Sequence, residues 1–304
     1  METVTVLLST YNGEKYLKEQ IDSILNQIGL NVCVFARDDG SKDSTVNILK
    51  EYSENYSNFS YYCGLNVGPA QSFFELIKQS PNSDYYAFAD QDDVWDQNKL
   101  ECAVKMLSKK DASIPQLYYS NLRIVDQDLK YYRMSHQKPY IHKKRYSALA
   151  EGCATGCTIV INTVARDFLK DKLPSECTMH DNWIYMVCKL FGEVNYDFEG
   201  HISYRQHGGN VIGTYLGKKN AKTYIKRFKR LFNRNLQPRY KNAISFWNAY
   251  GDLLNADDRK KVLEIVHYKN SFINRCKLLF DFDIGYEVRS RDIRYRILII
   301  LGLI

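Results

Sequence analysis

The chain has 304 residues, which is enough for one large α/β domain with an appendage or for two small domains. Its hydrophobic content of 45% and charged content of 25% are those of an ordinary globular protein. Eight scattered cysteines form no Cys-x-x-Cys pair and do not cluster with the six histidines, so a zinc site is not expected. No signal peptide opens the chain, and the thiols are therefore expected to be reduced, as in a cytosolic protein.

The first part of the chain predicts strands that alternate with helices. Short β-branched or aromatic runs predict strands at residues 4–9, 32–36, 59–63 and 85–89. Apolar residues at helical spacing predict helices at residues 16–27, 44–52 and 69–80. Such alternation implies right-handed crossovers and a mostly parallel, Rossmann-like sheet with flanking helices.

A polar loop follows each of these four strands, at residues 9–14, 37–41, 64–68 and 90–93. Ligands of parallel sheets bind beyond the carboxyl ends of the strands, at a topological switch point. We therefore expect all four loops to lie on one edge of one sheet. No Gly-x-Gly-x-x-Gly and no P-loop motif occurs in the chain, which counts against a dinucleotide enzyme and a P-loop nucleotidase.

The loop after the fourth strand places Asp90, Asp92 and Asp93 directly behind an apolar, aromatic run. Partly buried carboxylates repel each other and are costly to desolvate unless a cation lies between them. Mg²⁺ and Mn²⁺ take oxygen ligands and commonly share them with substrate phosphates. The pattern predicts a site for a metal–diphosphate complex; the alternative is a solvated acidic turn.

The loops after the first two strands are suited to a nucleoside. Thr10 and Tyr11 offer a hydroxyl and an aromatic face, and the Asp38 carboxylate can accept the N3–H of uracil or thymine. Gly40 permits a tight turn that brings backbone close to a ligand. The alternative for residues 38–41 is a turn followed by a helix cap.

Three motifs in this order, VLLSTYNG at 6–13, RDDGSKDST at 37–45 and ADQDD at 89–93, resemble those of family-2 glycosyltransferases. The resemblance extends to about residue 212 and implies an inverting enzyme of the GT-A nucleotide-diphospho-sugar transferase fold. It implies a nucleotide-binding set of Thr10, Tyr11, Asn12, Glu14, Asp38 and Asp90. It also implies an Mn²⁺ or Mg²⁺ site at Asp90 and Asp92, with Asp93 near the donor sugar.

Asp181 stands where the resemblance places the general base, a carboxylate at a helix start that deprotonates the acceptor hydroxyl. A helix N-terminus favours the ionised form that a base needs. The alternative is that Asp181 only caps the helix that runs to Leu190. His180 occupies a position where many relatives have Glu, and it either tunes the base or only packs. Residues 152–162 resemble the family segment that lines the acceptor pocket; the alternative is a packed turn.

The segment 203–213 resembles one in a rhamnosyltransferase-like branch that assembles polysaccharides. His207 precedes a Gly-Gly loop that is suited to closing over a diphosphate, and the resemblance adds His207 to the metal ligands. Arg205 can offer a bidentate fork to phosphate. The Gln-x-x-Arg-Trp motif of processive synthases is absent, which favours transfer of single sugars.

The charge is uneven along the chain, which predicts a basic helical region at 217–304 after a mildly acidic body at 1–216, and the resemblance makes that body the glycosyltransferase domain. Residues 217–304 hold 20 Lys and Arg against 8 Asp and Glu, whereas the first 216 residues hold 22 against 27. Residues 218–237 combine apolar residues at helical spacing with many cations, as do helices that bind anionic membrane surfaces. The alternative is a helical bundle that packs on the body. No nucleic-acid-binding motif is present.

Two functions of different classes follow. The first is an inverting transferase, peripheral at the inner face of the cell membrane. It would move a sugar from a nucleotide-diphosphate donor, dTDP-rhamnose before UDP-hexoses, to a lipid-linked or oligosaccharide acceptor in surface polysaccharide synthesis. The second is a non-catalytic, sugar-nucleotide-binding scaffold of a membrane assembly complex. A nucleotidyltransferase is disfavoured, because residues 9–14 lack a Gly-rich loop bearing Lys or Arg.

Overall fold

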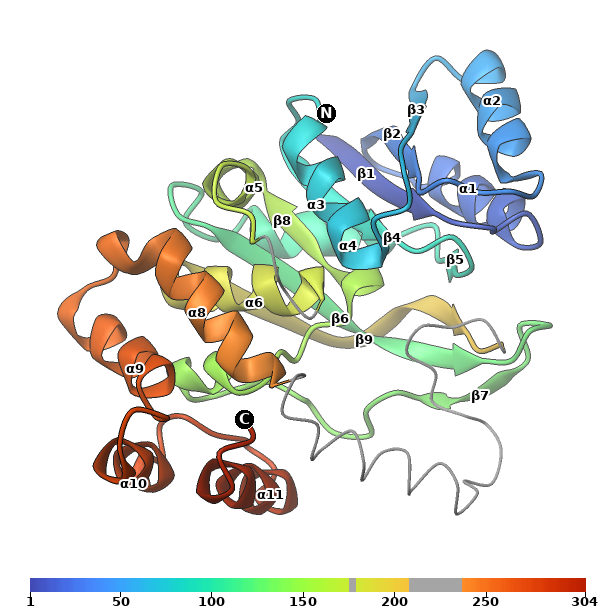
Figure 1. Cartoon of the computed structure of the whole chain (residues 1–304). Coiled ribbons are helices and arrows are strands. Elements are labelled where there is room, and N and C mark those ends of the chain that lie inside the picture. The colour runs from blue at the N-terminus through green and yellow to red at the C-terminus, as the bar shows by residue number, and fades with distance from the viewer. Residues whose placement is uncertain (175–178, 208–236) are drawn as a thin grey trace. The chain divides into compact units, whose positions relative to one another are not determined.

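A computed structural model describes residues 1–174, 179–207 and 237–304 (Figure 1). Its first strands are β1 (Thr3–Thr10), β2 (Asn31–Asp38), β3 (Phe59–Cys63) and β4 (Tyr85–Ala89), and the helices between them are α1 (Leu17–Leu25), α2 (Thr45–Asn55) and α3 (Pro69–Gln79). All seven predicted elements are confirmed. Strands β2, β1 and β4 run parallel side by side, and β3 continues the sheet beyond β2.

The sheet is mixed beyond β4. Its further elements are β5 (Val94–Trp95), α4 (Lys99–Leu107), β6 (Gln116–Val125), β7 (Tyr131–Met134), β8 (Val160–Asn162), α5 (Thr163–Lys170) and β9 (Glu193–Arg205). The strand order is β3-β2-β1-β4-β8-β6-β9-β5, with β7 on β6. Strands β6 and β9 are parallel, whereas the pairs β4–β8, β6–β8, β6–β7 and β5–β9 are antiparallel. The expected α/β fold is confirmed, with its parallel part concentrated in the first four strands.

The strand order explains where a ligand can bind. The chain builds outward from β1 to β2 and β3, and then returns to place β4 on the other side of β1. This reversal creates a topological switch point between β1 and β4. Both strands are buried: Val4, Val6 and Leu8 on β1 and residues 86–89 on β4 are fully inaccessible. The apolar strands therefore hold the loops after β1 and β4 on a rigid base.

The chain divides into two compact units. The first contains the sheet and covers the described residues in 1–140, 154–171 and 191–214; the second covers those in 141–153, 172–190 and 215–304. The second unit is helical, with α6 (His180–Phe191), α8 (Pro238–Tyr250), α9 (Ala256–Val266), α10 (Phe272–Phe280) and α11 (Arg289–Ile300). The expected domain boundary after residue 216 and the expected basic helix at 218–237, apart from Gln237, lie outside the described residues.

Side-chain contacts hold the helical unit together internally. The Arg145 guanidinium pairs with the buried Asp258 carboxylate at 2.8 Å, and the Trp183 ring packs edge-on against Phe246. Of the helices in the described ranges, none combines the length and the apolar run that a bilayer span requires.

Candidate functional site

The four polar loops lie together at the carboxyl end of the parallel strands, as predicted. The backbone N–H of Asp39 donates to the Thr10 carbonyl, and that of Gly64 donates to the Asp38 carbonyl, both at 2.8 Å. The Gln91 side chain accepts from the Tyr11 N–H at 2.7 Å and donates to the Tyr11 carbonyl at 3.0 Å. These bonds join the loops after β1, β2, β3 and β4 into one surface at the switch point.

The Asp38 carboxylate is buried and shapes its own loop. One oxygen accepts the N–H groups of Gly40 and Ser41 at 3.0 and 2.8 Å. The other accepts the hydroxyls of Ser41 and Thr10 at 2.5 and 3.2 Å. Gly40 has φ +81°, a conformation that favours glycine. Both oxygens are thus engaged, and reading a base through N3–H requires a hydroxyl of Ser41 or Thr10 to turn away.

Asn12 and Glu14 brace the first loop against the second. The Asn12 N–H donates to the Ser41 hydroxyl, and the Asn12 side-chain oxygen accepts from the Lys42 N–H, both at 2.8 Å. The Glu14 carboxylate accepts from the Ser44 N–H at 2.8 Å. Tyr11, Asn12 and Glu14 are all exposed, and Tyr11 at 45% offers the one aromatic ring among them to a nucleobase.

A buried ion pair orders the third loop, and sequence reasoning missed it. Arg37 and Asp39 lie 2.5 Å apart with about 4% of each side chain exposed. The Asp39 carboxylate also accepts the N–H groups of Val67 and Gly68 at 2.9 Å. At Gly64 any Cβ would overlap the Arg37 guanidinium, which explains the glycine. The only sign of this ion pair in the sequence is that a second acid, Asp39, directly follows Asp38 in the Asp-Asp-Gly motif.

Asp90 and Asp92 are half-buried at the end of β4, whereas Asp93 is completely buried. Burial, followed by the charges of Asp92 and Asp90, raises the pKa of Asp93 well above its usual value. The Asp93 carboxylate accepts the backbone N–H of Arg205 at 3.1 Å. The expectation that Asp93 meets the donor sugar therefore differs from the structure, in which this side chain turns inward as the chain enters β5. Ligand atoms of Asp90, Asp93 and the buried Cys157 lie within 4.8 Å of one another.

His207 lies beside the second acid of the Asp-x-Asp pair. Its Nε2 is 2.7 Å from Oδ2 of Asp92, and its ring lies 5.0 Å from that of Tyr16. Carboxylate oxygens with one imidazole nitrogen form a donor set that a divalent cation can use. The donors at Asp92 and His207, with Asp90 two residues away in the same loop, thus fit the metal that the fold class implies.

Arg205 is buried, and its guanidinium contacts protein groups. It donates to the carbonyls of Asp92 and Gln127 at 2.8 and 2.5 Å, and it pairs with the Glu19 carboxylate. It also lies over the Tyr16 ring, 4.4 Å from the centroid. The expected phosphate fork therefore differs from the observed arrangement, in which Arg205 ties the loop after β4 to α1. A buried guanidinium must satisfy its donors, and the loop carbonyls do so.

Lys99 is a second buried cation that the sequence did not reveal. Its ammonium lies 3.6 Å from the centroid of the Trp95 ring. Burial lowers the pKa of Lys99 to about 8, while the charges of Cys157 and Asp93 act in the opposite direction. A buried cation of this kind offsets the charge of the acidic loop. Its position at a helix start is typical of a solvated lysine, so no sequence signal was available.

In the second unit, Asp181 lies in the first turn of α6 and accepts the Asn182 N–H at 2.6 Å. His180 is buried, and desolvation lowers its pKa to about 3, so it is neutral near pH 7. Gly152 packs so closely on Asn182 that a Cβ would overlap the amide oxygen. His180 thus packs without carrying a charge beside Asp181, and the loop at Gly152 supports the start of α6.

Comparisons with known proteins agree with this fold. Residues 5–167 match the family described as "Glycosyl transferase family 2". The chain is 30% identical over 228 residues to the dTDP-rhamnosyl transferase RfbG of Shigella flexneri, covering 70% of this chain and 75% of that protein. It is 26% identical over 158 residues to the Escherichia coli UDP-Glc:alpha-D-GlcNAc-diphosphoundecaprenol beta-1,3-glucosyltransferase WfgD, covering 52% of this chain and 59% of WfgD.

Among solved structures, residues 1–349 of S. aureus TarS in complex with UDP-GlcNAc superimpose with a TM-score of 0.59 at 16% identity. The match covers 92% of this chain and 77% of that one. This likeness confirms the expected GT-A fold. Together, the sequence matches and the fold show that the chain belongs to glycosyltransferase family 2.

Proposed function

We propose that this protein is a metal-dependent, inverting transferase that moves one sugar from a nucleotide-diphosphate donor to a sugar hydroxyl of a lipid-linked acceptor. The observation that carries this proposal is the contact between Asp92 and His207 at the switch point, where four polar loops meet. Cell-surface polysaccharide synthesis at the inner face of the cell membrane is the setting that suits such a reaction.

Each part of the loop surface has a proposed task. The nucleoside lies against Tyr11 in the surface built by Thr10, Asn12, Glu14 and Asp38. Asp90, Asp92 and His207 would hold Mn²⁺ or Mg²⁺, which supplies positive charge for the diphosphate leaving group. Arg205 keeps the backbone of Asp92 in place through its carbonyl contact.

Asp181 is the proposed general base. Its carboxylate takes the proton of the acceptor hydroxyl while the hydroxyl oxygen forms a bond to the anomeric carbon of the donor. The bond from that carbon to the diphosphate oxygen breaks on the opposite face, and the electron pair leaves with the nucleoside diphosphate. The product is inverted at the anomeric carbon, with no covalent enzyme intermediate. The neutral state of His180 leaves the ionised form of Asp181 without a charged histidine neighbour.

The relatives suggest which substrates to test. RfbG is named as a dTDP-rhamnosyl transferase, and WfgD as a UDP-glucosyltransferase that acts on a sugar linked to diphosphoundecaprenol. Thymine and uracil share the N3–H that Asp38 could accept, so the loop accommodates either base. We propose dTDP-rhamnose as the first donor and a UDP-hexose as the second, each with a diphospholipid-linked acceptor.

The test is turnover of a panel of dTDP-, UDP- and GDP-sugars with Mn²⁺ or Mg²⁺ and a lipid-linked acceptor extract. The wild type is compared with Asp92→Asn and Asp181→Asn. We expect one donor to be used, with activity lost on chelation and in both variants. Donor binding without turnover under all conditions would favour a sugar-nucleotide-binding scaffold. Absence of donor binding would overturn the proposal.

A further inference from the structure

Helix α10 exposes its large apolar residues. Phe272, Ile273 and Phe280 are 78%, 68% and 68% exposed, whereas Leu278 is fully buried. At about 100° per residue, the three exposed side chains lie within about a third of the helix circumference. Phe282, just beyond the helix, is 62% exposed as well. The exposed side of a surface helix is normally polar, whereas the exposed side of α10 carries large apolar residues.

Helix α11 repeats the pattern. Ile293, Ile297, Ile300 and Leu301 are 53%, 50%, 54% and 45% exposed, and they follow the i, i+4, i+7, i+8 spacing of one helix face. The opposite side of the helix is buried through Tyr295, Leu298 and Ile299. The helix therefore has one apolar side that is buried in the protein and a second apolar stripe that is exposed to solvent.

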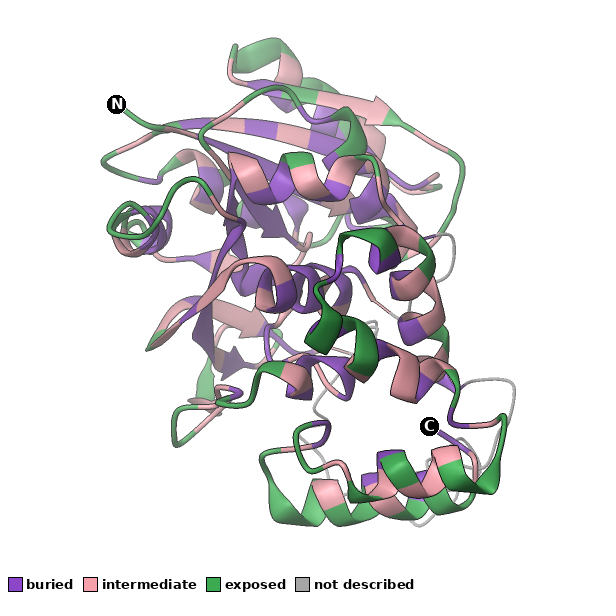
Figure 2. Cartoon of the chain, turned by 90° about the vertical axis from the view of Figure 1, so that its left-hand side faces the viewer, coloured by how far each residue is buried: buried purple, intermediate pink, exposed green. Residues whose placement is uncertain are grey.

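The two helices belong to one packed structure. The Arg296 guanidinium on α11 donates to the carbonyls of Leu278 and Leu279 on α10 at 3.0 Å. Figure 1 labels α10 and α11 next to each other, and in Figure 2 the helical segment below the C-terminus carries exposed residues along its length. Apolar residues gathered in this way on a folded surface mark a contact with another body, whereas isolated ones do not. We call the eight exposed residues of 272–301 named above the apolar face.

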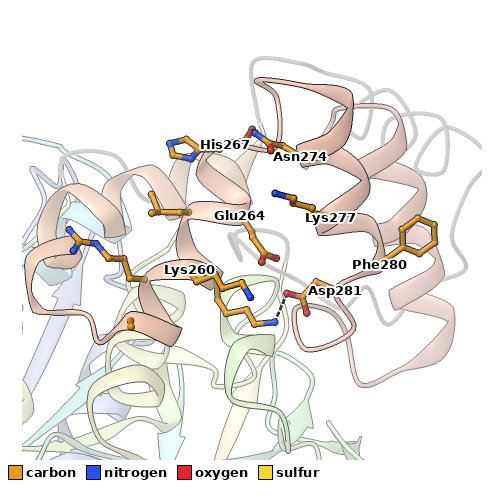
Figure 3. A pocket seen from close by; sticks show the side chains of 11 residues that line it. Lys260, Glu264, His267, Asn274, Lys277, Phe280 and Asp281 are labelled. Atoms are coloured by element: carbon orange, nitrogen blue, oxygen red, sulfur yellow. Dashed lines mark hydrogen bonds and ion pairs between the residues drawn. The ribbon is translucent and has the colours of Figure 1, made fainter.

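Cations border the apolar face. Lys277 on α10 and Arg289 and Arg294 on α11 are exposed, and at about 100° per residue the two arginines flank the apolar stripe of α11. Lys277 also lines a cavity of about 850 Å³ between α9 and α10, together with Arg259 and Lys260. Figure 3 shows the Lys277 side chain reaching from α10 toward α9, with Phe280 on the same helix. Residues 269–304 hold seven Lys and Arg against four Asp and Glu.

We propose that the apolar face docks on an anionic membrane, with its aromatic and aliphatic side chains at the acyl boundary and Lys277, Arg289 and Arg294 among the lipid phosphates. Interfacial helices combine these two features. A second copy of the chain fits less well, since it would set the same cations against each other. The apolar face is made of residues within 272–301, and the proposal does not depend on the proposed sugar transfer.

The test is cosedimentation of the full-length protein with vesicles of phosphatidylcholine alone or with a third of phosphatidylglycerol. We expect binding to the anionic vesicles that weakens with salt, and at least a tenfold lower partition coefficient for Phe280→Ser/Ile297→Ser. Lys277→Glu should weaken binding to the anionic vesicles only. Leu253→Ser, at another half-exposed leucine of the helical unit, and Lys50→Glu on α2 are the matched controls.

Three outcomes would overturn the proposal. Wild-type protein that binds neither vesicle, or face variants that bind like the wild type, would show that the apolar face does not contact lipid. A wild-type dimer that Phe280→Ser/Ile297→Ser dissociates in sedimentation velocity would assign the face to self-association. Circular dichroism melting of each variant checks that the fold is retained. Donor turnover is measured separately, so a failure of membrane docking is distinguished from a failure of the proposed sugar transfer.

Discussion

His207 Nε2 and Asp92 Oδ2 lie 2.7 Å apart although the residues are separated by 115 positions in the chain. The contact follows from the antiparallel pairing of β5 with β9, in which Val94 lies opposite Ser203. This register brings the carboxyl end of β9 to the loop that carries the Asp-x-Asp pair. The sheet thus places an imidazole beside a carboxylate at the edge where ligands of such sheets bind.

His207→Asn should raise the Mn²⁺ concentration for half-maximal activity at least about tenfold, because the donor set loses its imidazole nitrogen. Asp92→Asn should abolish metal-dependent turnover. The measurement is a metal titration of activity, with calorimetry of Mn²⁺ binding. His201→Asn is the control, since His201 bonds to Asp197 on the same strand. Equal metal affinities for His207→Asn and wild type would remove His207 from the metal site.

Glu19 and Arg205 should act as a positioning pair for Asp92. Glu19→Gln and Arg205→Lys should each lower metal-dependent kcat. The first removes the carboxylate that pairs with the Arg205 guanidinium, and the second removes the guanidinium that donates to the Asp92 carbonyl. The kcat of the double variant should be no lower than that of the less active single variant. In a double-mutant cycle this corresponds to a coupling energy above about 0.5 kcal/mol. Additive effects, or a large rise in donor KM alone, would instead indicate that Arg205 binds phosphate.

Asp181→Asn should leave the dissociation constant of the donor unchanged and lower transfer to the acceptor by roughly 10²- to 10⁴-fold, because the amide cannot accept the proton. Single-turnover transfer and donor calorimetry separate the two effects. Asp257→Asn is the control, since Asp257 is also an acid in the first turn of a helix, α9. If the two variants behave alike, Asp181 only stabilises its helix.

His180 should make stability depend on pH. Its pKa is lowered from 6.5 to about 3 in the folded protein, so below about pH 6.5 the unfolded chain takes up a proton that the folded one does not. Stability is therefore lost as the pH falls, by about 1.4 kcal/mol per unit. Urea unfolding at about pH 7.5 and about pH 5 should show about 2 kcal/mol more loss for wild type than for His180→Gln. Equal losses of unfolding free energy in wild type and His180→Gln would mean that His180 is solvated in the folded protein.

Gly192→Ala should destabilise the sheet unit by at least about 2 kcal/mol. A Cβ at this position would overlap the backbone carbonyl of Pro115, at the point where β6 and β9 begin to pair. At Gly200, which lies on β9, a Cβ would meet mainly the flexible end of Met134, so Gly200→Ala should cost less. Thermal unfolding of both variants makes the comparison. A Gly192→Ala protein as stable as Gly200→Ala would contradict the close backbone approach.

The sequence alone determined the parallel part of the sheet and the place of the ligand edge. Strands such as residues 85–89 are buried on both faces, and such strands are continuous apolar runs that stand out in a sequence. Each polar loop followed directly from where its strand ended, so the convergence of Thr10, Asp38 and Asp90 could be predicted before any contact was known.

Only the tertiary structure decided what several charged side chains do. Arg205 and Asp93 both suit a diphosphate-sugar by residue type, yet both are buried and hold the loop together. Burial also made His180 neutral and placed Lys99 over Trp95. The physical reason is that local sequence sets strand and loop propensity, whereas the direction of a side chain after a turn depends on which distant strand pairs there. For Asp93 and Arg205 that strand pair is β5 with β9.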